Sequence, residues 1–471
     1  MARALSVPAP TGLDAMARLA GVSIDSRTVG PADLFFAIHG PRHDGHGFVA
    51  AALAAGAAAC VVSRERIGEY PPEIQPRLFA VQNTLEALQQ LAREVRRAWG
   101  GRVAAVAGSV GKTTTKEILA ALVAARFRTL KTEGNLNNEY GLPLTLARLE
   151  PEHEAAVVEL GMSHSGELAA LTAIAEPNVG VVTRVAVEHL EFFDSIDAIA
   201  AAERELIEGL RGRDAVAVLN ADDERVMRFA EAAPGRIVTF GLGAGADFRA
   251  EQIEDRGAGG SAFTLISPAG RTRLELSLIG RHNVANALAA LAAASVWGIG
   301  ATDATQVLPH MKPAAMRGEV LHLGGGLTVI NDCYNSSPTA MESMLEVLAQ
   351  TPGSKRRILA AGEMLELGPN SAELHYQAGE AAARHHLDWI IAVCGHAQQM
   401  IRGAVEGGHT KDRTRFFETS EDAADFVASL VGSGDLVLVK GSRGVHMERI
   451  VEAIRERYAP LVAASRERAQ G

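Results

Sequence analysis

Short apolar runs alternate with amphipathic stretches along most of this 471-residue chain. Runs bounded by glycine or polar residues indicate buried strands, whereas apolar residues recurring every three or four positions indicate helices. In residues 84–99 the apolar positions form one stripe from Leu85 to Trp99, and Thr84 is a suitable N-cap. This alternation of strands and helices predicts an α/β protein.

The pattern changes character twice, which predicts three domains. Residues 1–83 carry short strands around one alanine-rich helix, and residues 84–314 alternate strands and helices before a glycine-rich, β-like stretch. In residues 315–471 the alternation restarts, as is typical of a separate doubly wound domain. The expected strands are 34–38, 58–63, 78–81, 103–107, 155–160, 179–183, 215–219, 237–240, 327–331, 357–361, 389–394, 415–417 and 436–440, and two expected helices are 117–126 and 284–296.

Composition narrows the classes of function. The net charge of −10 gives no overall positive field, which argues against a nucleic-acid-binding protein. The three cysteines, Cys60, Cys333 and Cys394, are far apart in sequence and indicate reduced thiols in a cytoplasmic protein. The first residues lack a signal peptide's apolar region and no apolar run could span a bilayer, so we expect no membrane insertion. Nothing in the sequence demands more than a monomer.

The clearest chemical signal is a glycine loop between an expected strand and an expected helix. It reads Gly108-Ser109-Val110-Gly111-Lys112-Thr113-Thr114, the composition of a phosphate-binding loop. Backbone amides and the helix N-terminus would hold phosphate oxygens, the lysine would reach the outer phosphates and a threonine hydroxyl would help hold Mg²⁺. Gly108 and Gly111 enclose only two residues, fewer than in the usual motif, which points to a subset of nucleotide enzymes. We expect this loop to bind ATP or GTP.

Further polar residues follow the expected strands of the central domain, at the edge where open α/β sheets bind ligands. Glu159 ends one strand, and its carboxylate suits Mg²⁺ beside phosphates, although a strand-end salt bridge would also explain it. His189 follows the next strand, as a metal ligand or as a structural histidine. The asparagine-rich loop 135–143 offers amide groups to a peptide or a sugar, or is simple turn chemistry.

Three more positions suggest ligand contacts. Asn283 begins a helix, where it is an N-cap or a partner for a purine edge. Asp332 follows the first strand of the third domain and suits ribose hydroxyls. Lys440 ends the last strand and offers a cation to a carboxylate or phosphate.

Taken together, these motifs resemble those of the Mur ligases, ATP-dependent amide-forming enzymes of peptidoglycan synthesis. The resemblance covers nearly the whole chain, and Gly362-Glu-Met-Leu-Glu-Leu-Gly368 and Lys440-Gly-Ser-Arg look most like the branch that adds D-alanyl-D-alanine. The Asp-Asn-Pro-Arg sequence of the diaminopimelate-adding branch is absent from the chain. The other matching motifs are Asp25-Ser-Arg, Asp33-Leu-Phe-Phe-Ala, Asp44-Gly-His, Gly108-x-x-Gly-Lys-Thr-Thr, the loop 135–143, Glu159-Leu-Gly, His189-Leu-Glu, Gly280-Arg-His-Asn, Arg317-Gly and Asp332-x-Tyr-Asn.

The resemblance implies a fold and a reaction. The fold would comprise a small α/β UDP-binding domain, a central P-loop ATPase domain with a parallel sheet, and a C-terminal Rossmann-like, doubly wound domain that binds the incoming dipeptide. ATP would phosphorylate the terminal carboxylate of a UDP-N-acetylmuramoyl-tripeptide, and the amine of D-alanyl-D-alanine would attack the resulting acyl phosphate. The implied cofactors are ATP and Mg²⁺, and the protein would mainly position groups and neutralise charge.

The resemblance also implies roles for individual residues. The catalytic residues would be Lys112, Glu159, His189 and Arg317, with Thr113, Glu159 and His189 holding Mg²⁺. The nucleotide would contact the loop from Gly108 to Thr114, with Asn283 at adenine and Asp332 at ribose. Ser26, Arg27, Asp44 and His46 would meet the UDP moiety, and Asn137 and Asn138 the muramoyl-peptide. Tyr334, Asn335 and Ser336 would lie near the incoming dipeptide, with Lys440 also on the substrate side.

One position departs from the family pattern. Many relatives have, in the helix after His-Leu-Glu, a lysine whose carbamate binds a second Mg²⁺, whereas Glu203 stands at that position here. We expect Glu203 to replace the carbamate as a metal ligand, through a water molecule or a closer helix. The alternative is an exposed helix glutamate paired with a neighbouring residue.

Two other functions stay open on sequence alone. The first is another amide ligase of the same superfamily, Mur-type or folylpolyglutamate-type, although the UDP-like motifs of the first domain count against the folate version. The second is a nucleotide-dependent switch, which would leave the motifs of the third domain unexplained. No motif marks the third residue of the tripeptide.

Overall fold

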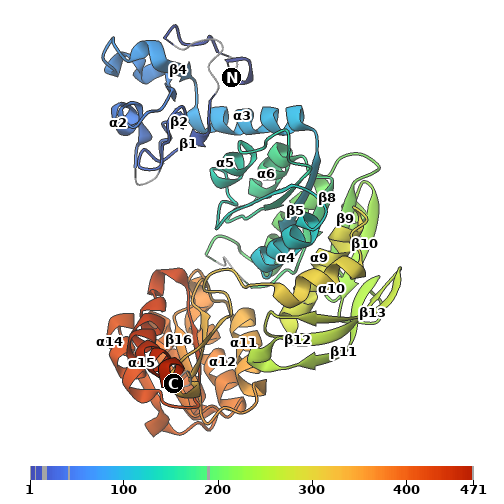
Figure 1. Ribbon diagram of the computed structural model, residues 1–471, viewed down its shortest axis with the longest axis vertical. Helices are drawn as coiled ribbons and strands as arrows, with labels where there is room; N and C mark the ends of the chain where they lie inside the picture. Colours follow the sequence, from blue (N-terminus) through green and yellow to red (C-terminus); the bar gives the residue numbers. More distant parts are fainter. Residues whose placement is uncertain (1, 6, 13–18, 41–42, 188–190, 469–471) are drawn as a thin grey trace.

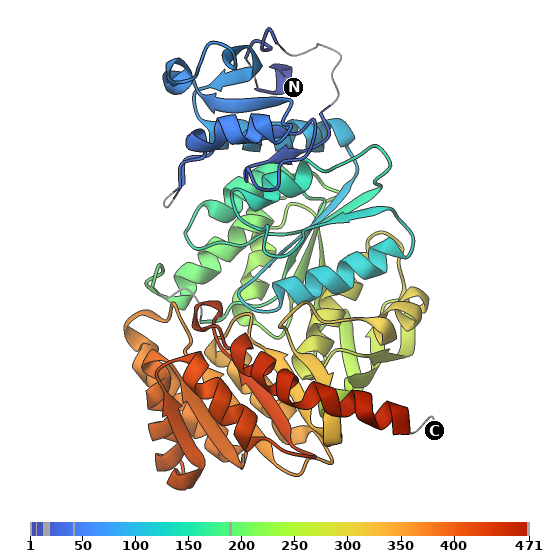
Figure 2. The same cartoon turned by 60° about the vertical axis from the view of Figure 1, so that its left-hand side comes forward.

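The computed structural model describes residues 2–5, 7–12, 19–40, 43–187 and 191–468. These residues form three sheets that follow one another along the chain. In Figures 1 and 2 the sheets and their helices lie as three tiers along the long axis, in the order of the sequence. The expected three-domain α/β architecture is therefore present.

The first sheet is small and parallel, because each of its short apolar runs is separated from the next by a helix or loop. Its strands are arranged in sequence order: β1 (Val22–Ser23), β2 (Leu34–Phe36), β3 (Ala59–Ser63) and β4 (Leu78–Val81). Residues of β2 and β3 are buried on both faces. The short helices α1 (Ala2–Leu5) and α2 (Val49–Ala54) accompany this sheet.

Helix α3 (Thr84–Trp99) joins the first domain to the second, over the range that its apolar stripe predicts. Leu88 and Leu91 pack into the core of the first sheet, whereas Ala92 belongs to the core of the second. The prediction that Thr84 is the N-cap was wrong. Asn83 has the extended backbone of an N-cap, and its Oδ1 accepts hydrogen bonds from the amides of the first helical turn.

The central sheet has nine strands in the order β13-β12-β11-β10-β9-β8-β5-β7-β6, and all neighbours are parallel except that β12 is antiparallel to both β11 and β13. The glycine-rich stretch thus forms β strands, as expected. The bounds are β5 (Arg102–Ala107), β6 (Thr129–Lys131), β7 (Ala155–Glu159), β8 (Val179–Val182), β9 (Val216–Asn220), β10 (Arg236–Gly241), β11 (Phe248–Asp255), β12 (Ser261–Ser267) and β13 (Gly270–Leu276).

Helices cover both faces of the central sheet, which is why its inner strands are apolar at every position. In β5, Ala104 and Val106 pack toward α4 and α9, whereas Val103 and Ala105 pack toward α6 and α7. Helix α4 begins at Lys112, earlier than the predicted Glu117. The helices are α4 (Lys112–Ala124), α5 (Gly141–Leu146), α6 (Glu167–Ala175), α7 (Ile196–Glu208), α8 (Glu224–Met227), α9 (Arg281–Ser295) and α10 (Ala301–Val307).

The third sheet has six strands in the order β14-β15-β19-β16-β17-β18, all parallel except the edge strand β14. Strand β14 was not predicted, because its residues are only partly buried and show no apolar run. The strands are β14 (Glu319–His322), β15 (Thr328–Asp332), β16 (Arg357–Gly362), β17 (Trp389–Val393), β18 (Thr414–Phe417) and β19 (Leu436–Lys440), and the helices are α11 (Pro338–Gln350), α12 (Ser371–Arg384), α13 (Gln398–Glu406), α14 (Ser420–Leu430) and α15 (Glu448–Arg468).

The chain changes sheet between β4 and β5 and again between β13 and β14. The expected domain boundaries near residues 83 and 315 lie within these intervals, but their exact positions stay a prediction. Within the described part of the chain, no helix has the length and apolar character that crossing a bilayer requires.

Candidate active site

A cavity of about 1030 Å³ lies between the second and third domains. Its walls come from the carboxyl ends of β5, β7, β8 and β9 on one side and of β15, β16 and β19 on the other. Open α/β sheets bind ligands at this edge. The residues that line it include 109–114, 137–139, 159, 161–164, 183–184, 281–283, 317–318, 334–337, 365–367 and 442–444.

The glycine loop adopts a backbone conformation that residues other than glycine take up only with strain. Gly108 and Gly111 have φ values of 120° and 94°, in the left-handed region. A Cβ atom on Gly108 would lie 2.2 Å from Thr183 Oγ1, and one on Gly111 would lie 2.3 Å from Asn286 Oδ1. Thr183, directly after strand β8, and Asn286 of helix α9 therefore lie so close to the loop that only glycine fits.

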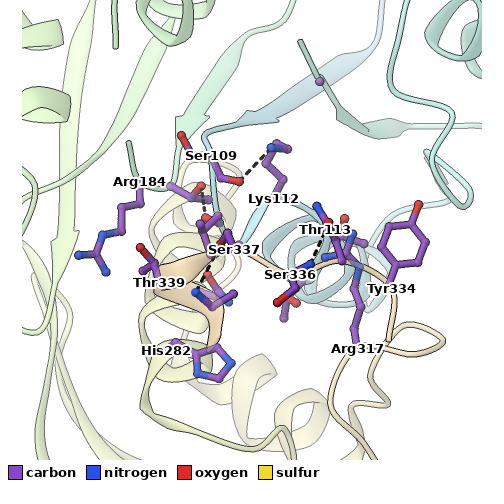
Figure 3. A pocket seen from close by; sticks show the side chains of 18 of the residues that line it. Ser109, Lys112, Thr113, Arg184, His282, Arg317, Tyr334, Ser336, Ser337 and Thr339 are labelled. Atoms are coloured by element: carbon purple, nitrogen blue, oxygen red, sulfur yellow. Dashed lines mark hydrogen bonds between the residues drawn. The ribbon is translucent and has the colours of Figure 1, made fainter. Parts of the chain in front are cut away.

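Lys112 lies at the first position of α4 and folds back over the loop. Its Nζ donates to the carbonyl oxygens of Gly108 at 2.6 Å and Ser109 at 3.2 Å, as Figure 3 shows for Ser109. The Ser109 hydroxyl is buried, and no described residue hydrogen-bonds to it. Val110, Thr113 and Thr114 also line the cavity, so the structure brings the predicted loop residues together at the N-terminus of a 13-residue helix.

Glu159 lies at the end of β7, where it lines the same cavity and is 3% exposed. Its Oε1 accepts a hydrogen bond from Asn137 Nδ2 at 2.8 Å, while Oε2 is buried and has no hydrogen-bond partner in the described part of the chain. Leaving a buried carboxylate oxygen unsatisfied is costly. A divalent cation beside bound phosphates would satisfy it.

The donor set fits a cation shared with a nucleotide. Among the described residues, no three His, Cys, Asp or Glu side chains gather closely enough to hold a metal by themselves. Mg²⁺ usually takes one or two carboxylates plus substrate phosphates, which Glu159 and the Thr113 hydroxyl could complete. The predicted ligand His189 lies outside the described residues. Glu203 is 1% exposed on α7 and not among the cavity-lining residues. The alternative of an exposed helix glutamate was therefore wrong, whereas its expected role as a metal ligand stays a prediction.

The start of α9 shows that one of the two expected roles of Asn283, the N-cap, was wrong. The N-cap is Gly280, not Asn283. Asn283 Nδ2 donates to Ile279 O at 2.8 Å, and its Oδ1 accepts from Asn286 Nδ2 at 2.9 Å. Asn283 thus orients Asn286, which lies against Gly111 and which sequence reasoning missed. The repeat of asparagine one helical turn later was the available signal.

The third domain contributes a buried ion pair to the opposite wall. Lys440 Nζ lies 2.6 Å from Asp332 Oδ2 and donates to Asn335 O at 3.0 Å, and the lysine is 2% exposed. One oxygen of the predicted ribose acceptor is therefore paired already. The Ser336 hydroxyl is buried in the cavity wall, and no described residue bonds to it.

Arg317 lies where the chain passes from the second domain to the third. Its guanidinium carbon lies 4.2 Å from the ring centroid of Tyr334, a cation–π distance, and Figure 3 shows the two side by side. Two cavity residues that sequence reasoning missed are Arg184 and His282. Burial lowers the pKa of His282, and the nearby Asp332 only partly opposes this effect.

The predicted UDP-binding residues lie in the first domain, away from this cavity. Arg27 holds Asp25 through two parallel hydrogen bonds, which lower the Asp25 pKa to about 2. Burial would raise the pKa of Asp44, but hydrogen bonds from His46 and Arg66 outweigh it and hold that pKa well below its usual range. Ser26 lies between Asp25 and Arg27 in the same turn.

His46 is a structural residue of that loop. Its Nδ1 lies 2.7 Å from Asp44 Oδ1, and its Nε2 accepts from Ser63 N at 3.0 Å. With both ring nitrogens engaged and 5% exposure, His46 supports the loop from beneath. Any contact with a UDP moiety from this segment would come from Asp44 rather than from the imidazole.

His375 fixes a loop of the third domain that lines the cavity. Its Nε2 accepts from Met364 N at 2.8 Å, its Nδ1 donates to Ser371 O at 2.7 Å, and it is fully buried. Burial lowers its pKa, although the Ser371 carbonyl and Glu363 oppose this; His396 reinforces the lowering. The folded protein therefore prefers the neutral ring, which can accept from the Met364 amide.

Because of this histidine, we expect the free energy of unfolding to decrease as the pH is lowered below about 6.5. The unfolded chain binds the proton at the ordinary pKa and the folded chain only at a lower pH, so stability present above 6.5 is lost as the pH falls, by at most about 1.4 kcal/mol per pH unit. Melting temperatures of the unaltered chain and His375→Gln at pH 7.5, 6.5 and 5.5 measure it. Equal losses in both proteins would contradict the prediction.

Three family models match the chain. The Mur ligase family catalytic domain matches residues 18–96, the Mur ligase middle domain 106–294, and the Mur ligase glutamate ligase domain 316–443. A curated relative, the UDP-N-acetylmuramoyl-tripeptide–D-alanyl-D-alanine ligase of Bacillus subtilis (strain 168), is 35% identical over 436 residues, which cover 93% of each chain.

Solved structures agree with this relationship. MurF from Acinetobacter baumannii superimposes with a TM-score of 0.86 at 31% identity, covering 97% of this chain and 98% of that one. The MurF ligase of Thermotoga maritima in complex with ADP gives a TM-score of 0.80 at 30% identity, covering 93% and 97%. The similarity therefore extends over all three domains.

Proposed function

The chain belongs to the Mur ligase family, and we infer that it ligates D-alanyl-D-alanine to UDP-N-acetylmuramoyl-tripeptide at the expense of ATP. It is a peptide ligase of peptidoglycan synthesis that forms a C–N bond and binds ATP. One observation carries this conclusion beyond the family relationship. The phosphate-binding loop of the second domain and the Asp332–Lys440 wall of the third line one cavity, so a nucleotide and a second substrate can meet there.

The reaction needs two nucleophilic displacements, one after the other. An oxygen of the tripeptide carboxylate attacks the γ-phosphorus of ATP, and ADP leaves with the electrons of the broken P–O bond. The amine of the dipeptide then attacks the carbonyl carbon of the acyl phosphate, losing a proton as the C–N bond forms and phosphate departs. Phosphate is a far better leaving group than oxide, so the ATP makes the amide bond accessible.

The chain's own contribution is positioning and charge. Lys112 Nζ would exchange the carbonyls of Gly108 and Ser109 for outer phosphate oxygens, and α4 would direct its N-terminal amides at them. Arg317 would add a second cation from the linker when the third domain moves toward the second.

We propose that Mg²⁺ accompanies the nucleotide, and that Thr113 and Glu159 hold it. It would neutralise charge on the phosphate oxygens. The buried, unsatisfied Oε2 of Glu159 supports this assignment. His189 and Glu203 are proposed for a second ion, since the family resemblance places them there.

The remaining roles are proposals as well. Asn283 would act on the nucleotide through Asn286, and Asp332 would reach the ribose with the oxygen not paired to Lys440. The proposed dipeptide contacts are Tyr334, Asn335 and Ser336, with Lys440 holding Asn335 in place. The proposed contacts with the UDP-peptide are Ser26, Arg27, Asp44 and Asn138, with His46 in support, and the family resemblance implies Asn137 as a further one.

Phosphate release from ATP tests the function. We expect release to require Mg²⁺, the UDP-muramoyl-tripeptide and D-alanyl-D-alanine together, and a UDP-muramoyl-pentapeptide mass to appear. Omitting each component in turn gives the controls. Release that is indifferent to D-alanyl-D-alanine, or absent with all components, would overturn the assignment in favour of another acceptor or of a nucleotide switch.

A further inference from the structure

The loop after β6 folds over the end of β7 and brings an amide onto Glu159. Asn137 Nδ2 donates to Glu159 Oε1 at 2.8 Å. The backbone carbonyl of Asn137 accepts from Gly161 N at 2.9 Å, two residues beyond that glutamate. The loop is therefore tied to the strand end twice, once through its backbone and once through the asparagine side chain.

Gly161 leaves the space that this arrangement needs. A Cβ atom at position 161 would lie 2.9 Å from Asn137 Nδ2 and 3.0 Å from its Cγ. Cβ atoms essentially never lie closer than 3.0 Å to another heavy atom, so a side chain at 161 would displace the amide. The amide can lie across the strand end only because residue 161 is a glycine.

The bond to Asn137 decides how the carboxylate of Glu159 is turned. A carboxylate held at one oxygen by a fixed donor loses the rotation about its last bond, so its other oxygen is fixed too. That other oxygen, Oε2, is the buried atom without a hydrogen-bond partner among the described residues. Donors of this kind orient metal ligands, and their loss usually weakens metal binding without removing a ligand.

We propose that Asn137 is a positioning residue, which holds Glu159 so that Oε2 can bind the magnesium ion of the bound nucleotide. The inference rests on the proposed function, but it gives Asn137 a different role from the muramoyl-peptide contact that the resemblance implies. Because Glu159 engages one of the two Nδ2 hydrogens, only the other hydrogen and Oδ1 are left for a peptide. The two roles change different measured quantities.

Nucleotide binding tests the proposal without any ligation. Fluorescence of a mant-labelled ATP, titrated with Mg²⁺, gives the Mg²⁺ concentration at half-maximal binding. We expect Asn137→Ala to raise that concentration about tenfold. Gly161→Ala keeps Asn137 but displaces its amide, and it should produce a similar shift. It also keeps the proposal testable if Asn137→Ala does not fold.

Glu133→Ala is the matched control, because Glu133 lies in the same loop but pairs with Arg148 at the surface. It should leave the Mg²⁺ requirement within about twofold. In a Glu159→Gln background, Asn137→Ala should add no further shift, because the ligand it positions is no longer charged.

Steady-state kinetics test the alternative that Asn137 contacts the UDP-tripeptide. We expect the KM for the UDP-tripeptide to change less than about twofold in Asn137→Ala. An unchanged Mg²⁺ requirement with a raised KM would overturn the proposal and make Asn137 a substrate contact. An unchanged value of both would overturn it too. Failure of ligation alone would count against the proposed function, not against this inference, which the nucleotide titration decides.

Discussion

Replacing Lys112 with alanine is expected to lower kcat about a thousandfold, the largest effect of any single change considered for this chain. Its ammonium group is held at the mouth of the phosphate-binding loop by the carbonyls of Gly108 and Ser109. Those carbonyls become available to other donors when the lysine turns to a phosphate, so the move costs little. Without the lysine, negative charge developing on the transferred phosphoryl group loses its nearest fixed cation.

The fold should survive the substitution. The two carbonyl bonds contribute only about 1 kcal/mol each, and the glycine backbone that shapes the loop is unchanged. Circular dichroism and the melting temperature check this, and kcat from coupled ADP release gives the effect. Lys131→Ala is the matched control, since Lys131 is exposed, pairs with Glu117 and does not line the cavity. A Lys112→Ala enzyme within tenfold of the unaltered rate would contradict the prediction.

Much of the fold could be predicted because the strands are buried on both faces. Strand β5 shows why: alternate residues enter two different cores, so the whole run must be apolar and stands out in the sequence. Edge strand β14 has no such constraint, since it is partly buried and packs on one neighbour, and it escaped prediction. Prediction was reliable where burial is complete.

The residues of the site could be predicted from the sequence, but the contacts between their side chains could not. The glycine loop, Glu159 and Asp332 were found because each lies at the carboxyl end of a strand or directly after it, at the ligand-binding edge. That Lys440 pairs with Asp332, across 108 positions of sequence, depends on β15 and β19 being neighbours in the sheet. That Asn137 bonds to Glu159 depends on a loop folding back over β7. Neither contact has a local sequence signal.

The N-caps of α3 and α9 were predicted at the wrong residues because neighbouring residues at each helix start can serve as the cap. Both Asn83 and Thr84 can cap α3, and the asparagine wins because it holds the extended backbone that a cap requires. At α9 the chain uses Gly280, whose φ of 85° is left-handed, so Asn283 falls inside the first turn and bonds backward to Ile279. Periodicity locates a helix but does not choose between adjacent polar residues.

Replacing Glu203 with alanine is expected to lower kcat about a hundredfold at low millimolar Mg²⁺, and high Mg²⁺ should restore part of the loss. Glu203 lies on the buried face of α7, between Ile199 and Leu206, and is 1% exposed. An apolar residue would suit that face better, because burying a carboxylate is expensive unless an ion or a donor compensates it. The resemblance to the Mur ligases implies a metal ligand at this position, so we propose that a cation is one of the partners of this carboxylate.

The effect of bicarbonate on the rate distinguishes a glutamate ligand at position 203 from the carbamylated lysine of many relatives. Helix α7 contains no lysine, so no carbamate can form on it, and we expect added bicarbonate to leave the rate of the unaltered enzyme unchanged. The Glu203→Lys variant should instead become dependent on bicarbonate, since it restores the group that carbon dioxide modifies. Glu208→Ala is the control on the same helix, where Glu208 is exposed and pairs with Arg204. A strong bicarbonate dependence of the unaltered enzyme, or an unchanged Mg²⁺ requirement in Glu203→Ala, would sink the assignment of Glu203 as a metal ligand.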